Sequence, residues 1–199
     1  MTTRRERILA EGMRLFGERG YAATSIAQIE EAAGLAPGSG SLYKHFKSKE
    51  ELLSAGLEQL LSSRGDTLAP LEQRPADRGA ALDAAARAGL QRMAQDRDLN
   101  RILFRGLAAF PELLAKFGEE EIARTSRDTA DFLAGLADAD GTDGGTDWEA
   151  LATVLQGATA HYWLLEDLFG EHPTGVSPER FLTALVGLAR AGIAASPEA

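Results

Sequence analysis

Apolar residues recur three and four positions apart along most of the chain, which is the spacing of one buried face of an α-helix. No segment shows the alternation of apolar and polar residues that is typical of a half-buried strand. The pattern therefore predicts an all-α protein of about nine helices. After the first 47 residues, helices are expected at 48–64, 76–95, 99–110, 112–137, 148–169 and 178–194.

Two shorter helices are predicted before residue 35. Apolar residues between Ile8 and Phe16 recur at helical spacing and predict the first of them. The second helix opens at Thr24 or Ser25, since either hydroxyl can satisfy an unpaired amide as the N-cap. Gly34 fits the left-handed backbone position that ends a helix, so the chain is expected to turn there.

A third short helix is expected to start at 37–39 and to bury Leu42 and Phe46, which are four positions apart. Its outward residues are short, polar or basic, namely Ser39, Ser41, Lys44 and His45. A helix that approaches base edges and phosphates needs such a surface. Two short helices joined at a glycine therefore indicate a helix-turn-helix, a motif that places its second helix in the major groove of DNA.

The net charge of −9 is distributed unevenly along the chain. Residues 1–49 carry eight Lys or Arg against five Asp or Glu, whereas residues 65–199 carry 12 against 22. A modest basic footprint on an acidic protein fits binding to a specific DNA site better than general coating of nucleic acid. The alternative interpretation is that these charges form ordinary solvated surfaces.

The chain has no cysteine, which excludes a disulfide framework, a thiol nucleophile and a Cys-ligated zinc site. Its N-terminus lacks the apolar region of a signal peptide, and no apolar run reaches 18 residues. We therefore expect a cytoplasmic protein with no membrane partner. Nothing in the sequence indicates a cofactor.

The N-terminal motifs carry a family resemblance. L-F-x-x-x-G-Y-x-x-T-S-I-x-x-I is followed by A-G-L and then by S-L-Y-K-H-F-x-S-K-E-E-L. Over residues 4–53 this pattern resembles the DNA-binding domain of the TetR family of transcriptional repressors. The resemblance implies a DNA-binding domain at 1–48 and a ligand-binding and dimerisation domain at 49–199. It also implies a homodimer that binds a palindromic operator and is released by a small-molecule inducer; the alternative is an activator, or a regulator controlled by a protein partner.

The resemblance further implies which residues contact DNA. Thr24 and Ser25 are expected at the phosphate backbone, with Gln28 nearby. The residues expected at base edges are Ser39, Gly40, Ser41 and Lys44, and those expected at phosphates are Tyr43, His45 and Lys49. This chain departs from the common pattern in two ways: the segment between Leu35 and Leu42 is two residues longer, and Glu30 replaces a small alanine. A buried carboxylate at that position needs a partner.

The C-terminal helices suggest two further sites. Aromatic and neighbouring side chains are expected to line an inducer cavity at the place where the family has one, or else to form a filled core: Met93, Phe104, Phe110, Phe117, His161, Tyr162 and Trp163. Small residues on the helices expected at 148–169 and 178–194 allow close packing, which favours a dimer interface through these two helices over an intrachain core. Among these small residues are Gly157, Ala158, Gly187 and Ala191.

Other chemistry has weaker support. Asp138, Asp140, Thr142, Thr146 and Glu149 occupy ligand positions of a calcium loop, but the glycine of its sharp turn is replaced by Asp143. We therefore expect a connector and no metal site. His161 and His172 have no partner at the spacing of metal ligands or of a catalytic triad, so the sequence does not favour an enzyme.

Overall fold

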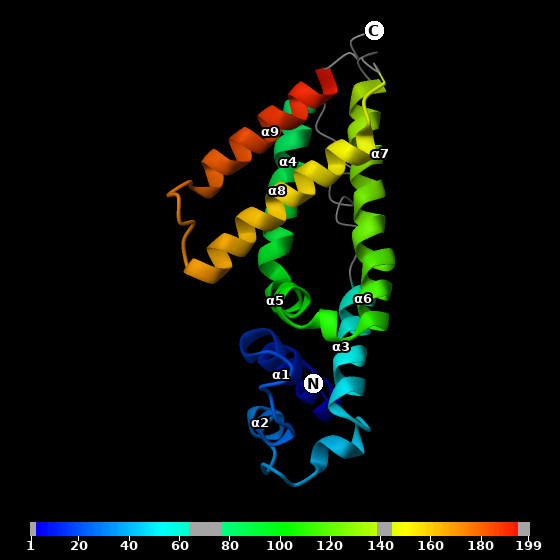
Figure 1. The fold of residues 1–199 in the computed structure, drawn as a ribbon, viewed down its shortest axis with the longest axis vertical. Helices are drawn as coiled ribbons and strands as arrows, with labels where there is room; N and C mark the ends of the chain where they lie inside the picture. Colours follow the sequence, from blue (N-terminus) through cyan, green and yellow to red (C-terminus); the bar gives the residue numbers. More distant parts are fainter. Residues whose placement is uncertain (1–2, 64–76, 139–144, 195–199) are drawn as a thin grey trace. The chain divides into compact units, whose positions relative to one another are not determined.

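The computed structural model describes residues 3–63, 77–138 and 145–194, and the regular elements in these ranges are all helical (Figure 1). The all-α prediction is therefore confirmed. The predicted break at 70–75 and the calcium-loop positions Asp140 and Thr142 lie outside the described residues. The chain forms two compact units, Met1–Gly65 with Asp96–Glu120, and Asp66–Gln95 with Glu121–Ala199, here called unit 1 and unit 2.

Unit 1 consists of short helices around an apolar core. Ile8, Phe16, Ile29, Leu42 and Phe46 lie in this core and are almost completely buried. Its elements are α1 (Arg4–Arg19), α2 (Ile26–Ala32), the 3₁₀-helix η1 (Ser41–Lys44), α3 (Lys49–Ser63), α5 (Arg97–Arg105), the 3₁₀-helix η3 (Leu107–Ala109) and α6 (Pro111–Phe117).

Glycines in α1 allow its neighbours to approach closely. A Cβ on Gly12 would lie 2.6 Å from a methyl carbon of Leu52 in α3. A Cβ on Gly17 would lie 3.0 Å from the Cα atom of Asp98 in α5. Since α3 and α5 both pack on α1, unit 1 extends past the domain boundary expected at residue 48 and also includes a segment distant in sequence.

Unit 2 is built from helices of 15 to 22 residues: α4 (Arg78–Gln95), α7 (Arg124–Asp138), α8 (Trp148–Phe169) and α9 (Pro178–Ala194). α8 and α9 each pack on α4 and on α7, and also on each other. Figure 1 shows α8 and α9 running in opposite directions, joined by the segment after Gly170. Within the described ranges, none of the helices combines the length and the apolar character that a membrane crossing requires.

Two predicted helices have the bounds that the pattern gave, at 148–169 and 178–194. The helix predicted at 99–110 is wrong at its C-terminal end, because α5 stops at Arg105 and η3 follows Gly106. The helix predicted at 112–137 is interrupted after Phe117 by a π-helical segment, η4 (Gly118–Ala123). Glycine is a poor helix former, and one lies at each of these two interruptions, Gly106 and Gly118.

Candidate nucleic-acid interface

The segment predicted as a third helix from 37–39 is instead a turn followed by a single helical turn. Gly38 and Gly40 have φ angles of 72° and 68°, in the left-handed region that favours glycine. A right-handed helix cannot include these residues, so η1 begins only at Ser41. Phe46 is buried as predicted but lies beyond the end of η1.

Glu30 of α2 lies directly behind η1. Its side chain is fully buried, and its Oε1 atom accepts a hydrogen bond of 2.9 Å from the backbone N–H of Leu42. The Oε2 atom is buried and has no hydrogen-bond partner among the described residues. The departure from alanine at this position therefore places a carboxylate between the two helices of the motif.

The start of α2 decides between the two possible caps. Ser25 is the N-cap: its Oγ accepts from the N–H of Gln28, and its own N–H donates to Oε1 of Gln28 at 2.8 Å. Thr24 is buried, and its hydroxyl lies 3.1 Å from the carbonyl oxygen of Leu15 and 2.9 Å from that of Gly20. The structure thus directs the Thr24 side chain into the protein, not toward the surface where a phosphate contact was expected.

Lys49 also has intramolecular partners. Its Nζ donates to the carbonyl oxygens of Tyr21 at 2.7 Å and of Thr24 at 2.9 Å, and it lies 4.1 Å from the centroid of the Tyr21 ring. Burial lowers the pKa of this ammonium group. Two of its three N–H donors therefore bind the turn between α1 and α2, and the contact of Lys49 with DNA stays a prediction.

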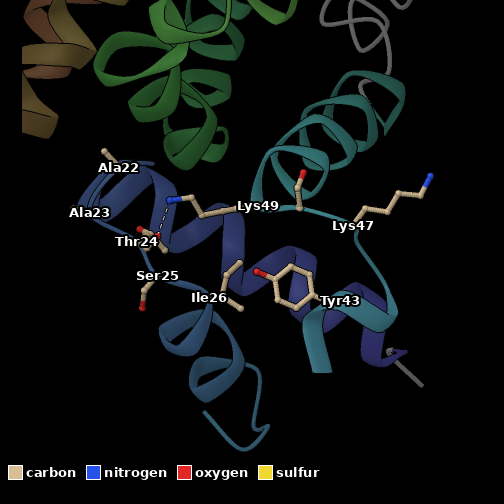
Figure 2. A pocket seen from close by; sticks show the side chains of 9 residues that line it. Ala22, Ala23, Thr24, Ser25, Ile26, Tyr43, Lys47 and Lys49 are labelled. Carbon is tan, nitrogen blue, oxygen red and sulfur yellow. Dashed lines mark hydrogen bonds between the residues drawn. The ribbon is translucent and has the colours of Figure 1, made fainter. Parts of the chain in front are cut away.

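A pocket of about 450 Å³ lies beside this turn (Figure 2). In Figure 2 the Lys49 side chain points toward Thr24, whereas Lys47 extends away from the other side chains. The pocket brings together Thr24, Ser25, Tyr43 and Lys49, four of the predicted DNA-binding residues. The prediction omitted Ala22, Ala23, Ile26, Lys47 and Ser48, which also line it. Of these, Lys47 carries a signal in sequence, because it belongs to the basic N-terminal set.

The remaining predicted DNA-binding residues lie on or next to η1. Tyr43 is 57% exposed. Ser39 Oγ donates to Ser41 Oγ at 2.8 Å, and Lys44 is exposed. Gly40 precedes η1, and His45 follows it and is partly exposed. Polar groups therefore surround Tyr43 on the surface of unit 1.

The residues predicted to bind a ligand divide between the two units. Phe104, Phe110 and Phe117 belong to unit 1, where Phe110 makes an edge contact with Tyr21 at 4.7 Å between ring centroids. Met93, His161, Tyr162 and Trp163 belong to unit 2. Tyr162 stacks on His172 and on Phe181, whereas His161 is exposed. The inducer site stays a prediction.

The exposed surfaces of α8 and α9 carry large apolar side chains. Val154, Leu168 and Phe169 of α8 are exposed by 54%, 49% and 65%, and Leu188 of α9 by 46%. The small residues Gly157, Gly187 and Ala191 are also exposed, whereas Leu155 and Leu185 are buried within unit 2. The predicted interface residues are thus divided between an intrachain core and an open apolar face.

Comparison with known proteins agrees with this geometry. Residues 8–55 match the family model described as bacterial regulatory proteins of the tetR family. The chain is 36% identical over 73 residues to the uncharacterized HTH-type transcriptional regulator YerO of Bacillus subtilis. It is 41% identical over 59 residues to the HTH-type transcriptional repressor KstR2 of Mycolicibacterium smegmatis. These alignments cover 37% and 30% of this chain, but only 25% and 28% of the relatives' own lengths.

Solved structures match over nearly the whole chain. A regulatory protein of the tetR family from Rhodococcus RHA1 aligns over 99% of this chain and 100% of its own, with a TM-score of 0.70 and 22% identity. A TetR-family regulator from Pectobacterium atrosepticum aligns over 94% and 90%, with a TM-score of 0.58 and 25% identity. The fold extends through both units, while the sequence similarity is concentrated at the helix-turn-helix. Residues 8–55 therefore carry the DNA-binding domain of the tetR family of bacterial regulatory proteins, and the chain as a whole is similar in fold to solved TetR-family regulators.

Proposed function

We propose that the protein is a ligand-responsive repressor that binds a palindromic DNA operator as a homodimer in the cytoplasm and has no catalytic activity. The observation that carries this proposal is the pocket of about 450 Å³ beside η1, which combines a hydroxyl, an exposed lysine and an exposed tyrosine. Ser25, Tyr43 and Lys47 supply these groups. Hydrogen-bond donors and positive charge of this kind are what phosphate contacts require.

The roles within the interface follow from exposure. Ser25, Tyr43 and Lys47 are on the surface and are assigned to phosphates, together with His45. Ser39, Ser41 and Lys44 lie around η1 and are assigned to base edges. Thr24 and Lys49 are assigned a supporting role, because their side chains bind backbone carbonyls behind the surface.

Dimerisation is supported by the apolar face of α8 and α9. Exposed large apolar residues that share one pair of helices are typical of a protein–protein contact. A second copy of the chain is the natural occupant, because two recognition elements related by a two-fold axis reach half-sites about 34–36 Å apart on B-DNA. One small helix-turn-helix alone makes few base contacts.

Control by a small molecule would act through the dimer. A ligand that favours a different spacing of the two recognition elements lowers DNA affinity, and operator DNA must then lower ligand affinity by the same factor. The typical coupling is about 1–3 kcal/mol, or roughly 5- to 150-fold. The part of the predicted ligand-binding set that belongs to unit 2, which includes Tyr162 and Trp163, is the proposed site.

The test begins with selection of duplexes from random-sequence DNA by the purified protein. We expect enrichment of a palindrome, a dimer by sedimentation, and a monomer with intact helical circular dichroism for Ala191→Arg. Gln91→Arg, at an exposed position of α4 outside the proposed interface, is the control for a new surface charge. Failure to enrich any sequence would exclude operator binding, and a wild-type monomer bound to DNA would exclude the palindrome.

A small-molecule screen by thermal shift then tests the ligand. A compound that stabilises the protein should bind more weakly in the presence of the selected operator. Equal affinities with and without operator would remove ligand control and would favour the alternative, a regulator controlled by a protein partner. Whether the promoter is repressed or activated is read from a reporter gene placed behind the selected operator.

A further inference from the structure

The first amides of η1 are satisfied by side chains from outside the helix. Its N-cap is Gly40, which has no side chain and makes no side-chain cap. The N–H of Ser41 donates to Ser39 Oγ at 3.3 Å, and the N–H of Leu42 donates to the Glu30 carboxylate at 2.9 Å. The second of these contacts spans 12 residues and joins η1 directly to α2.

The hydrogen bond between Leu42 and the buried Glu30 carboxylate is an energetically costly contact between the two helices. Burying a carboxylate is costly unless its hydrogen bonds are satisfied, and only one oxygen of Glu30 has a partner. Leu42 and Ile29 are fully buried and already supply apolar packing at the same place. An apolar side chain of similar volume would therefore hold α2 against η1 at least as well. In addition, the carboxylate provides a hydrogen-bond acceptor that holds the Leu42 amide in one position.

The turn before η1 needs such a fixed acceptor, because the turn alone does not determine how η1 is oriented. Residues 36–39 are exposed, and Gly38 and Gly40 both adopt left-handed conformations. Glycine has the widest choice of backbone conformations, so this turn by itself specifies the rotation of η1 poorly. Fixing the Leu42 amide sets that rotation, and with it the directions of the exposed neighbours Tyr43 and Lys44.

We propose that Glu30 is a positioning residue for DNA recognition, whose buried carboxylate orients η1 and so determines sequence preference. This inference rests on the proposed function, since it assigns to η1 the contacts with base edges. It separates discrimination between DNA sequences from the stability of the protein, two properties that usually change together. Loss of the acceptor should reduce discrimination between DNA sequences, while overall stability and contacts with the phosphate backbone stay intact.

The experiment uses Glu30→Met, which keeps the volume and removes the acceptor, and Glu30→Gln, which keeps an oxygen at that position. Met and Gln have helix propensities close to that of Glu. The control is Glu31→Gln, at the exposed neighbouring position. Affinities are measured for the duplex selected by the wild-type protein and for a scrambled duplex of the same length. Both measurements use the same salt concentration.

We expect Glu30→Met to lose roughly tenfold or more in affinity for the selected duplex, the scale of one good base contact, with less than a twofold change for the scrambled duplex. Glu30→Gln and Glu31→Gln should keep the wild-type ratio. In Glu30→Met, the Leu42 amide should exchange faster with solvent, while the melting temperature stays unchanged because the loss of the hydrogen bond is offset by no longer burying a carboxylate. That exchange is measured without DNA, so it tests the contact directly.

Two results would overturn the assignment of Glu30 alone: an unchanged ratio in Glu30→Met, or equal losses for both duplexes together with a lower melting temperature. The second result would mean that Glu30 only stabilises the fold. Unchanged protection of the Leu42 amide in Glu30→Met would also overturn it. If the wild-type protein selects no sequence, the proposed function itself fails, an outcome recognised before any variant is made.

Discussion

Different kinds of contact stabilise the part of unit 1 that contains α2 and η1 and, separately, the helices of unit 2. In unit 1, Thr24, Glu30 and Lys49 each bind a backbone group at least nine positions away, and these bonds fix the turns that precede the short helices α2 and η1. In unit 2, comparable bonds join long helices side by side, as Gln156 of α8 does with Thr125 of α7. Short helices bury too little surface to be stable alone, so their ends need specific anchors.

The two regions also differ in what they leave exposed. Unit 1 presents Tyr43 amid hydroxyl and lysine groups, a surface suited to a charged polymer. Unit 2 presents Val154, Leu168, Phe169 and Leu188, a surface suited to another protein. We propose that one chain alone forms the surface of unit 1 that contacts DNA, whereas a second copy of the chain covers the apolar surface of unit 2.

Core substitutions should separate the two units most strongly. Phe16→Ala should lower the free energy of unfolding of unit 1 by about 3–5 kcal/mol, and Leu133→Ala that of unit 2 by about 2–5 kcal/mol, since both side chains are almost fully buried. Hydrogen exchange measured on peptides from each unit checks this. Each variant should lose protection mainly in its own unit. Equal loss in both units would show that they unfold as one.

Lys49, which binds backbone carbonyls, and Lys47, two positions earlier, should respond differently to substitution. Lys49→Met should lower the free energy of unfolding by about 1–3 kcal/mol, because two backbone carbonyls lose their donor. Lys47→Met should leave stability unchanged and should reduce the salt slope of DNA affinity by about one, because one fewer counterion is released. Urea denaturation and salt titration measure the two effects. The opposite pattern would place Lys49 at the phosphate and Lys47 in the fold.

Unit 2 has its own anchor at Tyr162, whose hydroxyl lies 2.8 Å from the carbonyl oxygen of Val176 and 3.0 Å from Glu166. Tyr162→Phe should cost about 0.5–1.5 kcal/mol, the net value of one hydrogen bond. The control is Tyr43→Phe, whose exposed ring should leave stability unchanged. Calorimetry that found equal effects would remove the distinction between anchoring and exposed tyrosines.

Tyr162 also predicts a dependence on pH. Burial, aided by the hydrogen bond to Glu166, raises the pKa of Tyr162 from 10.0 to about 12. Between these values the unfolded chain has lost the proton that the folded chain keeps, so the contribution of Tyr162 to stability is full below pH 10.0 and falls as the pH rises toward about 12. Tyr162→Phe should remove this part of the slope. An identical slope in the variant would assign it to other groups.

The smallest effect is expected at a surface ion pair of unit 1. Arg14 of α1 lies 2.7 Å from Glu11 and 2.8 Å from Glu18, but its side chain is 41% exposed. Solvent and salt screen such pairs, so Arg14→Gln should change the free energy of unfolding by less than about 0.5 kcal/mol. A larger loss in urea denaturation would mean that surface charge also anchors α1.

The sequence predicted best where the determining forces are local. The bounds of α8 and α9 follow from their periodicity, and Ser25, one of the two expected N-caps, caps α2. Gly34 has the left-handed φ angle of 75° that was expected at the end of α2. The helix predicted from 37–39 was wrong. Leu42 and Phe46 have the spacing of a helix, but Gly38 and Gly40 adopt left-handed conformations that a right-handed helix cannot include.

By itself, the sequence determined the all-α fold, the helix-turn-helix and the family, because periodicity, capping residues and a dense local motif act within a few positions of one another. Only the tertiary structure decided the directions of individual side chains at the interface. Lys49 reaches carbonyls 28 and 25 positions earlier, and Glu30 reaches an amide 12 positions later. A long side chain has several directions available, and the choice between them depends on which unpaired backbone groups the fold brings within reach.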